Sequence, residues 1–395
     1  GSFSLSLRIG LFLILMSVWL LHFFKSKNKA DFFKFQWNKT IFIFFIVLIW
    51  AFVWAIIRGN SFGDLFFDFN NWLFFLYIFP FFTVQDSEKF YQNILSILSS
   101  AAIIIFIKSI ALLYIFSHGF EAITPTLYKW VRDTRVGEIT PTGNGFYRIF
   151  IQSQIYSLFL FFILLFKKDR GRFIFLILSL TTVILSFSRS FWVGLGAGLF
   201  VWLIILILQK TKFTIIFKQI GQIILVNVVS VGLIFLVLNL PPKTEQKDFL
   251  SLIGDRASQT EAASTSRITQ LKPLFLKIVN HPIIGSGFGT QVTYFSSDPR
   301  ITDVTAGGTG EYTTYAFEWG YLDMWLKFGL FGVLIYLLFL GKIARRLYYT
   351  EYFGLLAALA ALVAVSFFSP YLNHPLGIGF VLLIYLLSTH NVRTE

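Results

Sequence analysis

Long apolar runs, separated by short polar segments, occupy most of this sequence. Most of the runs reach about 17 residues or more, which approaches the length that a helix needs to cross a bilayer. We therefore predict an all-α integral membrane protein, because a helix satisfies its own backbone groups in lipid. About eleven spanning helices are expected, near residues 4–24, 40–57, 66–83, 93–117, 149–166, 171–187, 190–208, 213–240, 319–340, 352–369 and 374–389.

Two polar segments are too long to be simple connections. Residues 118–148 contain Pro125 and Pro141 and should form an ordered loop or short re-entrant pieces. Residues 241–318, between the eighth and ninth predicted helices, form the large extracytoplasmic loop; its stretch Gln270–Asn280 has amphipathic helical spacing and predicts a surface-lying helix. The predicted organisation is 1–117 (helices 1 to 4), 118–148 (loop), 149–240 (helices 5 to 8), 241–318 (large loop) and 319–395 (helices 9 to 11 and a tail).

Basic residues in the short connections predict the orientation. Four clusters of lysine and arginine lie on the same side of the membrane if the odd-numbered helices run inward. That side is then the cytoplasmic side. The N-terminus is expected outside and the C-terminus inside. The clusters are Lys25, Lys27, Lys29, Lys34 and Lys39; Lys167, Lys168, Arg170 and Arg172; Lys210, Lys212 and Lys218; and Lys342, Arg345 and Arg346.

Composition narrows the possible functions. Hydrophobic residues make up 56% of the 395 residues and charged residues 13%, against about 25% charged in soluble domains. This excludes a soluble enzyme, a secreted disulfide scaffold and a nucleic-acid-binding domain. The absence of cysteine excludes thiol catalysis and Cys-ligated metals, and no His, Asp or Glu spacing matches a metal site, so we expect no metal or cofactor. The net charge of +13 lies mostly on the cytoplasmic side, so it reports orientation rather than a polyanionic partner.

Three arginines are candidate anion ligands at the outer face. Arg189 lies in Ser188-Arg189-Ser190, at a tight turn between two predicted helices. It could present a fixed guanidinium to a phosphate or diphosphate, or anchor the turn to lipid headgroups. Arg267 precedes the amphipathic stretch and is either a diphosphate ligand or a solvated loop charge. Arg148, at the outer end of the fifth predicted helix, could join a cationic site or terminate that helix.

Other polar positions are candidates for proton transfer or close packing. Glu318 lies at the entry to the ninth predicted helix, where a carboxylate either acts as a base or simply suits a helix N-terminus. The segment His281–Gly289 has three alternate glycines, which let the backbone approach a neighbouring helix or a ligand. Asp323 and Lys327 are four residues apart on one helix face, and we interpret them as a structural ion pair.

Taken in order, these motifs resemble the bacterial O-antigen polymerase/ligase superfamily, polytopic glycosyltransferases of the GT-C type. The matching features are Ser188-Arg189 at a tight hairpin, Arg267 followed by His281–Gly289 in a large outer loop, and Tyr321–Gly332 in the next helix. The resemblance covers roughly residues 186–389; the N-terminal half matches only in hydropathy. Many members carry His-Asn immediately before the Tyr-Leu of that helix, whereas this chain has Glu318-Trp319.

The resemblance implies a metal-independent, inverting glycosyltransferase in the bacterial cytoplasmic (inner) membrane. Its donor and acceptor would both be glycans linked to undecaprenyl diphosphate, with a chain-length regulator as a further partner. Arg189 and Arg267, helped by Arg148, would bind the donor diphosphate. Glu318 would be the acceptor base, with His281 as the alternative. Because the ligase-type His is replaced by a carboxylate, we expect a polymerase. The alternatives are a ligase that transfers the glycan to a lipid A core or another acceptor, and a flippase for lipid-linked oligosaccharides.

Overall fold

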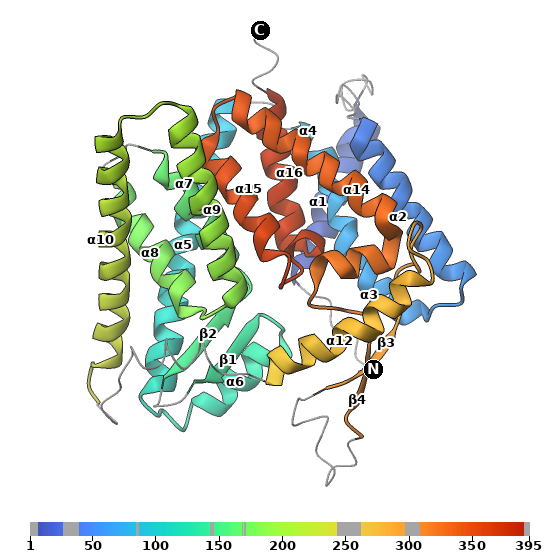
Figure 1. Cartoon of the computed structure of the whole chain (residues 1–395), viewed down its shortest axis with the longest axis horizontal. Coiled ribbons are helices and arrows are strands. Elements are labelled where there is room, and N and C mark those ends of the chain that lie inside the picture. Colours follow the sequence, from blue (N-terminus) through green and yellow to red (C-terminus); the bar gives the residue numbers. More distant parts are fainter. Residues whose placement is uncertain are drawn as a thin grey trace. The chain divides into compact units, whose positions relative to one another are not determined.

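The computed structural model describes most of the chain and divides it into two compact units. Unit 1 comprises residues 1–90, 261–350 and 366–395, and unit 2 comprises 91–260 and 351–365. Helices predominate in both, as the apolar runs predict (Figure 1). The described residues are 7–26, 39–83, 87–142, 146–167, 169, 171–242, 262–296 and 309–390. Several predicted cytoplasmic basic residues lie outside them, namely Lys27, Lys29, Lys34, Lys168 and Arg170, as do parts of the large loop, 243–261 and 297–308.

Unit 1 contains the first helices of the chain together with its long C-terminal helices. The predicted run 66–83 is three successive helical pieces, because the helix tightens to a 3-10 turn in the middle. The elements are α1 (Leu7–Lys25), α2 (Lys39–Ile57), α3 (Phe62–Leu73), η2 (Phe74–Tyr77), α4 (Ile78–Thr83), α12 (Ala262–Val279), β3 (Val292–Phe295), β4 (Glu311–Thr314), α14 (Gly320–Tyr349), η4 (Tyr371–Asn373) and α16 (Pro375–His390).

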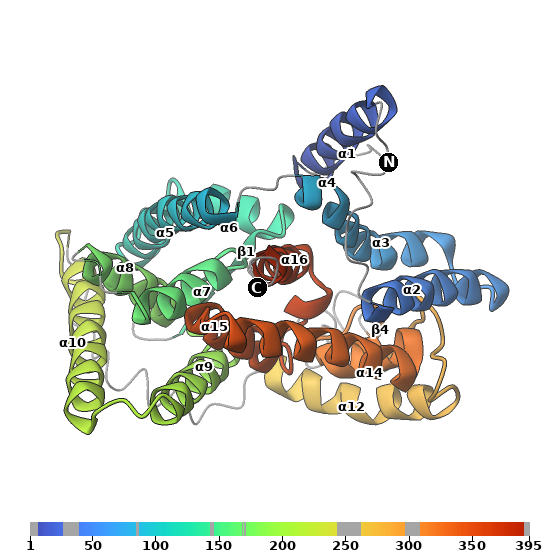
Figure 2. The same cartoon turned by 90° about the horizontal axis from the view of Figure 1, so that it is seen from above.

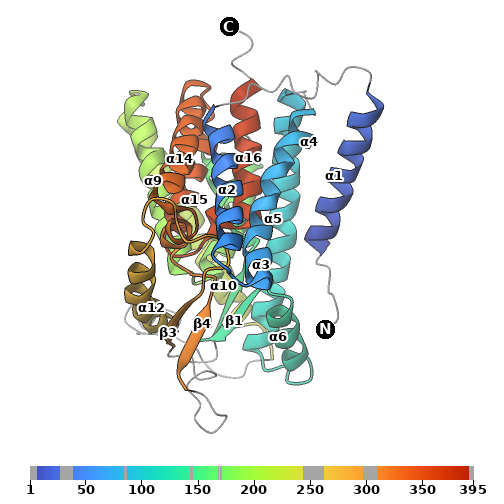
Figure 3. The same cartoon turned by 90° about the vertical axis from the view of Figure 1, so that its right-hand side faces the viewer.

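Helix α12 nearly covers the stretch 270–280 for which the amphipathic pattern predicts a helix. It packs against β3 and the first turns of α14 (Figure 3). The buried face of α12 contributes Leu274 and Ile278 to a small core with Val292, Phe317 and Leu326. This core fixes the residues that precede α14 against α12.

Unit 2 is a second helical bundle. Small residues let its helices approach closely, as is common where helices meet inside membranes: Gly194 of one helix faces Val365 of another, and Gly354 faces the backbone of Ile163. Helices α7, α9 and α15 consequently pack side by side (Figure 2). The elements are α5 (Ser87–Ser117), α6 (Thr124–Asp133), β1 (Gly137–Pro141), β2 (Tyr147–Ile151), α7 (Gln154–Leu165), α8 (Arg172–Leu185), α9 (Arg189–Leu208), α10 (Phe213–Leu238) and α15 (Phe353–Val365).

The chain is a multi-pass membrane protein with many apolar helices. Within the described residues, six helices are long and apolar enough to cross a bilayer: α1, α2, α5, α9, α10 and α14. Four shorter apolar helices, α7, α8, α15 and α16, accompany them. The expected number of about eleven spans therefore stays a prediction.

Two small antiparallel hairpins were not expected in an all-α fold. Strand β1 pairs with β2, and β3 pairs with β4. The helix expected from residue 149 begins only at Gln154, because residues 147–151 form β2. Buried Ile139, Ile149 and Ile151 explain the first hairpin, since they bury one of its faces in the core of unit 2. Together with α6, it gives ordered structure to part of the segment 118–148.

Candidate functional site

The three alternate glycines lie in a loop, residues 282–290, that we call the glycine loop. Gly285, Gly287 and Gly289 all have left-handed backbone, with φ of 76°, 86° and 71°, which side chains other than glycine adopt at a cost. A Cβ would come within 2.7 Å of Ala55 in α2 at Gly287, and within 2.5 Å of the backbone of Leu65 in α3 at Gly289. At Gly285 it would meet the backbone of α14. The glycines therefore serve close packing against three neighbouring helices, which was one of the two interpretations that the sequence allows.

Helix α14 is broken where the glycine loop meets it. Phe328 and Gly329 leave the helical conformation, and Gly329 has φ 75° and ψ 174°. The loop supplies partners for the backbone groups that the break exposes. Four backbone hydrogen bonds join the two segments: Ser286 N to Leu326 O (2.7 Å), Gly287 N to Lys327 O (2.9 Å), Leu330 N to Pro282 O (2.9 Å) and Phe331 N to Ile283 O (3.3 Å).

These hydrogen bonds explain how an apolar helix that is long enough to cross a bilayer tolerates a break. Irregular backbone at membrane depth is tolerated only where it is buried in protein or lines a water-filled cavity. Each buried backbone group left without a partner would cost about 1–3 kcal/mol. The Trp325 indole also donates to Pro282 O at 2.7 Å, adding a side-chain contact to the same carbonyl. The motifs His281–Gly289 and Tyr321–Gly332 thus form one structural unit, in which the glycine loop pairs with the backbone of the broken helix.

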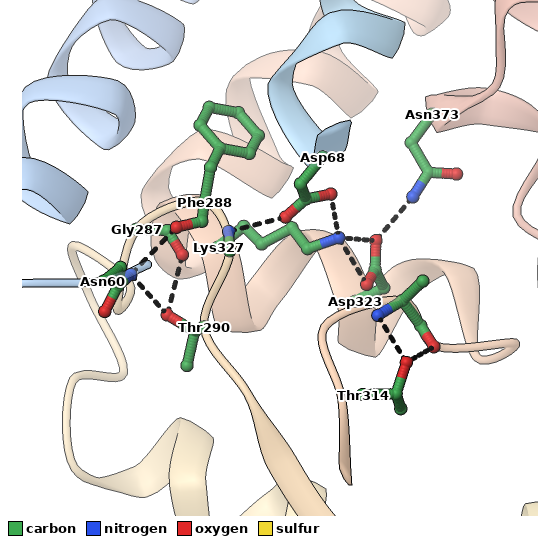
Figure 4. Close-up of polar contacts among 11 residues, drawn as sticks. Asn60, Asp68, Gly287, Phe288, Thr290, Thr314, Asp323, Lys327 and Asn373 are labelled. Atoms are coloured by element: carbon green, nitrogen blue, oxygen red, sulfur yellow. Dashed lines mark hydrogen bonds and ion pairs between the residues drawn. The ribbon is translucent and has the colours of Figure 1, made fainter. Parts of the chain in front are cut away.

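The far side of the glycine loop is held by Asn60, which follows α2. Its side-chain amide donates to Phe288 O at 2.8 Å and Thr290 Oγ1 at 3.1 Å (Figure 4). The ring of Phe288 is fully buried and packs against Phe69 and Trp72 of α3. The loop is therefore anchored by hydrogen bonds at its backbone and by aromatic packing at its centre.

Asp68, Asp323 and Lys327 form a buried charged cluster (Figure 4). The Lys327 ammonium lies 2.5 Å from Asp68 Oδ1 and 2.7 Å from Asp323 Oδ1. The backbone N–H of Gly289 donates to Asp68 Oδ2 at 2.9 Å, and the Asn373 amide donates to Asp323 Oδ2 at 2.5 Å. The predicted pairing of Asp323 with Lys327 is confirmed, and it extends to a second carboxylate that ties α3, α14 and the glycine loop together.

Asp68 and Asn373 were missed at the sequence level. A signal existed for Asp68, because it is an acidic residue within the apolar segment Phe66–Phe69, near the start of a predicted span. Such a residue needs a buried partner, and Lys327, which also lies within a predicted span, was a candidate. No local pattern marks Asn373, which reaches Asp323 from a distant connection.

Arg267 and Glu318 form an ion pair between the start of α12 and the start of α14. The side chains remain 32% and 52% exposed, so the pair is accessible. The indole of Trp319 donates to Arg267 O at 3.0 Å and fixes the backbone beside the guanidinium. The structure thus brings together two residues predicted for one site, although they lie 51 positions apart.

His281 lies at the other end of α12 and contacts Arg58, just past the end of α2. Val279 comes twelve positions after Arg267 in α12, which corresponds to about 18 Å at the helical rise per residue. His281 is therefore not part of the Arg267–Glu318 pair. Arg58 was also missed by sequence reasoning, since an arginine that ends an apolar helix reads as an ordinary membrane anchor.

The protonation of His281 follows from this contact. Arginine has no acceptor, so Arg58 donates to Nε2, which must carry the lone pair of a neutral ring. Burial lowers the pKa of His281 below its usual 6.5, and the positive charges of Arg58 and Lys277 lower it further. The ring is therefore neutral near pH 7, with its Nε2 lone pair already engaged.

The remaining two predicted arginines belong to unit 2. Arg189 is the first residue of α9, three residues after Ser186 caps α8, so the expected tight turn is present. Arg148 lies in β2 rather than at a helix end, which corrects its predicted position. Its Nε donates to Ser186 O at 3.0 Å, and its Nη1 lies 3.2 Å from Glu138 Oε2. Arg148 thus holds the turn that leads into Arg189.

Among the described residues, no three His, Cys, Asp or Glu side chains gather as a metal site would require. A comparison of the whole chain with curated proteins gave no match. Residues 173–337, a little over two fifths of the chain, match the family model described as O-antigen ligase. That region contains the Ser188–Arg189 turn, Arg267, the glycine loop and most of α14. This match supports the resemblance to the O-antigen polymerase/ligase superfamily over these residues, and with it a glycosyltransferase-like role in membrane glycan assembly.

Proposed function

We propose that the protein polymerises oligosaccharide repeats linked to undecaprenyl diphosphate, at the outer face of the bacterial cytoplasmic membrane. The Arg267–Glu318 pair carries the proposal, because it places a guanidinium and a carboxylate together at an accessible position within the matched region. The orientation with the N-terminus outside and the C-terminus inside, predicted from the basic clusters, supports this location.

Each of the two groups has a role in inverting glycosyl transfer. The acceptor sugar hydroxyl attacks the anomeric carbon of the donor glycan from the face opposite the diphosphate. The bond from that carbon to the phosphate oxygen breaks, and undecaprenyl diphosphate leaves. Glu318 takes the hydroxyl proton as general base. Arg267 stabilises the negative charge that grows on the leaving diphosphate.

The ion pair must open for both roles, and the energetics allow this. An exposed pair contributes about 0–1 kcal/mol. A hydrogen bond from a charged donor contributes about 1.5–3 kcal/mol, and arginine commonly makes two such bonds to one phosphate. A bound diphosphate therefore competes successfully for Arg267 and releases Glu318 to accept a proton.

We give Glu318 the role of base because Arg58 engages the Nε2 lone pair of His281. In addition, His281 lies near the C-terminal end of α12, away from the Arg267–Glu318 pair near its start. Arg189 is proposed as a further diphosphate ligand, from its position at the first turn of α9. Arg148 then acts indirectly, by holding the turn before Arg189 through Ser186.

A ligase is the second candidate, since the matching family model is described as O-antigen ligase and does not distinguish the two activities. The two activities share donor and chemistry and differ in the acceptor. We prefer the polymerase because Glu318-Trp319 replaces the His-Asn pair typical of ligases. A flippase would move the lipid-linked oligosaccharide without forming a glycosidic bond.

The test uses purified protein in nanodiscs, supplied with lipid-linked repeats and, in a parallel reaction, with a lipid A core acceptor. Product length is followed by gel electrophoresis. Polymerisation should fall about a hundredfold in Arg267→Ala and Glu318→Gln, in line with losses seen when charge-stabilising groups or general bases are removed. Arg132→Ala and Glu311→Gln are matched controls, since both residues are exposed.

Three results would count against this assignment. Unchanged polymerisation by Arg267→Ala and Glu318→Gln would remove both residues from the reaction. Transfer only to the lipid A core would identify a ligase. Translocation in sealed vesicles with no new glycosidic bond would identify a flippase.

A further inference from the structure

Two positively charged side chains and a neutral histidine lie near the C-terminal end of α12. We call Arg58, Lys277 and His281 the cationic group. Arg58 immediately follows α2, one of the helices long enough to cross the bilayer, so it lies where that helix leaves the apolar region. It contacts His281, and the charge of Lys277 acts on the same ring. Three basic side chains at the ends of two helices are thus grouped around His281 within unit 1.

The local electrostatics suit an anion. The two charges that act on His281 are both positive. One of the five N–H donors of Arg58 is used by His281, which leaves four donors on the guanidinium for a ligand or water. Arg58 is exposed, while His281 and Lys277 are partly buried. Neighbouring positive charges repel one another, and a phosphate would relieve this repulsion.

The exposed face of α12 connects this group to the Arg267–Glu318 pair. Ile268, Phe275 and Val279 lie on one stripe of the helix, and each is more than half exposed. Ile283, in the glycine loop, is 66% exposed as well. Exposed apolar residues at this spacing suit contact with hydrocarbon chains. The cationic group and the ion pair thus lie at opposite ends of an apolar surface.

Polymerisation brings together two lipid diphosphates that lie apart. The donor diphosphate is at the reacting carbon, because it is the leaving group. The acceptor reacts through the sugar at its far end, so its own diphosphate lies one oligosaccharide repeat away. Lys277 is ten helical residues from Arg267, which is about 15 Å. An oligosaccharide of a few sugars bridges such a distance.

We propose that Arg58, Lys277 and His281 bind the diphosphate of the second, acceptor lipid. This inference rests on the proposed function, which places the donor diphosphate at Arg267. Arg58 and Lys277 supply charged donors, and His281 supplies its Nδ1–H. The apolar stripe of α12 lies beside the polyprenyl chain. The spacing of the two anion sites then selects the length of repeat that reaches Glu318.

The number of bound lipids tests the proposal directly. Native mass spectrometry of the full chain in detergent, titrated with undecaprenyl diphosphate, should show two bound lipids for the wild type. Arg58→Gln/Lys277→Gln should retain one, as should Arg267→Gln. Losing a charged contact typically weakens binding about tenfold. Lys272→Gln is the matched control, because Lys272 is exposed on the same helix, and it should retain two.

The source of the phosphate is tested with phosphatidylglycerol added at the same concentration. Retention of both undecaprenyl diphosphates supports a substrate site, whereas displacement of the second identifies a phospholipid headgroup site and overturns the proposal. Should the double variant unfold, judged by its thermal transition, Lys277→Gln alone should weaken the second site about tenfold. An unchanged second affinity would overturn the proposal.

A kinetic arm separates this inference from the proposed function. With the donor fixed, the acceptor KM should rise at least about tenfold in Arg58→Gln/Lys277→Gln, while the rate at saturating acceptor is kept. If the wild type polymerises normally but binds only one lipid, the proposed acceptor site is contradicted and the proposed function is not. A wild type that forms no glycosidic bond contradicts the proposed function, and the lipid count still reports on the cationic group.

Discussion

Replacing Lys327 by methionine should destabilise the protein strongly. Lys327 is 2% exposed, and its ammonium lies within 2.7 Å of carboxylate oxygens from both Asp68 and Asp323. Methionine keeps most of the side-chain volume, so the main change is the loss of the positive charge that lies between the two buried carboxylates. Removing one partner of a buried ion pair costs about 3–5 kcal/mol.

The same reasoning predicts a rescue. In the triple variant Lys327→Met/Asp68→Asn/Asp323→Asn no buried charge remains, and replacing a whole buried ion pair by neutral groups is often nearly neutral. Residues in one network show non-additive effects. We therefore expect the triple variant to recover at least half of the loss, although two mutations have been added to a damaged protein.

The assay is the apparent unfolding temperature in detergent, followed by intrinsic tryptophan fluorescence. A loss of 3–5 kcal/mol corresponds to a decrease of roughly 10 °C, from the usual 2–4 °C per kcal/mol for large domains. Lys272→Met serves as the exposed control. If Lys327→Met unfolds at the wild-type temperature, or if the triple variant is less stable than the single one, the cluster is not held by charge pairing.

Three further predictions follow from the site. Gly329→Ala should lower the unfolding temperature by several degrees, because Gly329 has a positive φ and a Cβ there would collide with Ile283 O. Gly341→Ala is the control on the same helix and should be neutral or stabilising, because a Cβ there would meet open space. The pKa of His281 should lie below 6.5, so the ring gains its charge only at more acidic pH. The measurement is an NMR titration of histidine-labelled protein, with the His281 signal assigned from His281→Gln. Undecaprenyl diphosphate should raise this pKa, because a nearby anion favours the protonated ring. An unchanged titration would argue against an anion at His281. Arg148→Gln should slow polymerisation more than Arg132→Gln does, since only Arg148 hydrogen-bonds the turn before Arg189; equal rates would show that the turn needs no such support.

Sequence patterns predicted the features that depend on local periodicity. Apolar runs located most of the helices, because a bilayer demands continuous apolar surface. The i,i+4 spacing of Asp323 and Lys327 predicted their pairing, because both lie on one face of α14. The glycine motif predicted close backbone approach, although it did not say which partners were approached.

Features that depend on distant segments were not predictable in this way. Asp68 reaches Lys327 across 259 positions, and Arg58 reaches His281 across 223. The break in α14 was also missed, because Phe328-Gly329 lies inside an otherwise continuous apolar run. Strand β2 was read as the start of a helix, since Tyr147–Ile151 is apolar enough for either structure and only pairing with β1 decides between them.

The break in α14 also constrains how the protein is assembled. The ribosome makes α2, α3 and the glycine loop before α14, so the groups that complete the broken helix already exist when it arrives. A transplanted or isolated α14 would arrive in the membrane with open backbone groups and no partner. Biogenesis of this helix is therefore conditional on the earlier segments, and a swap of α14 between relatives should succeed only when the glycine loop travels with it.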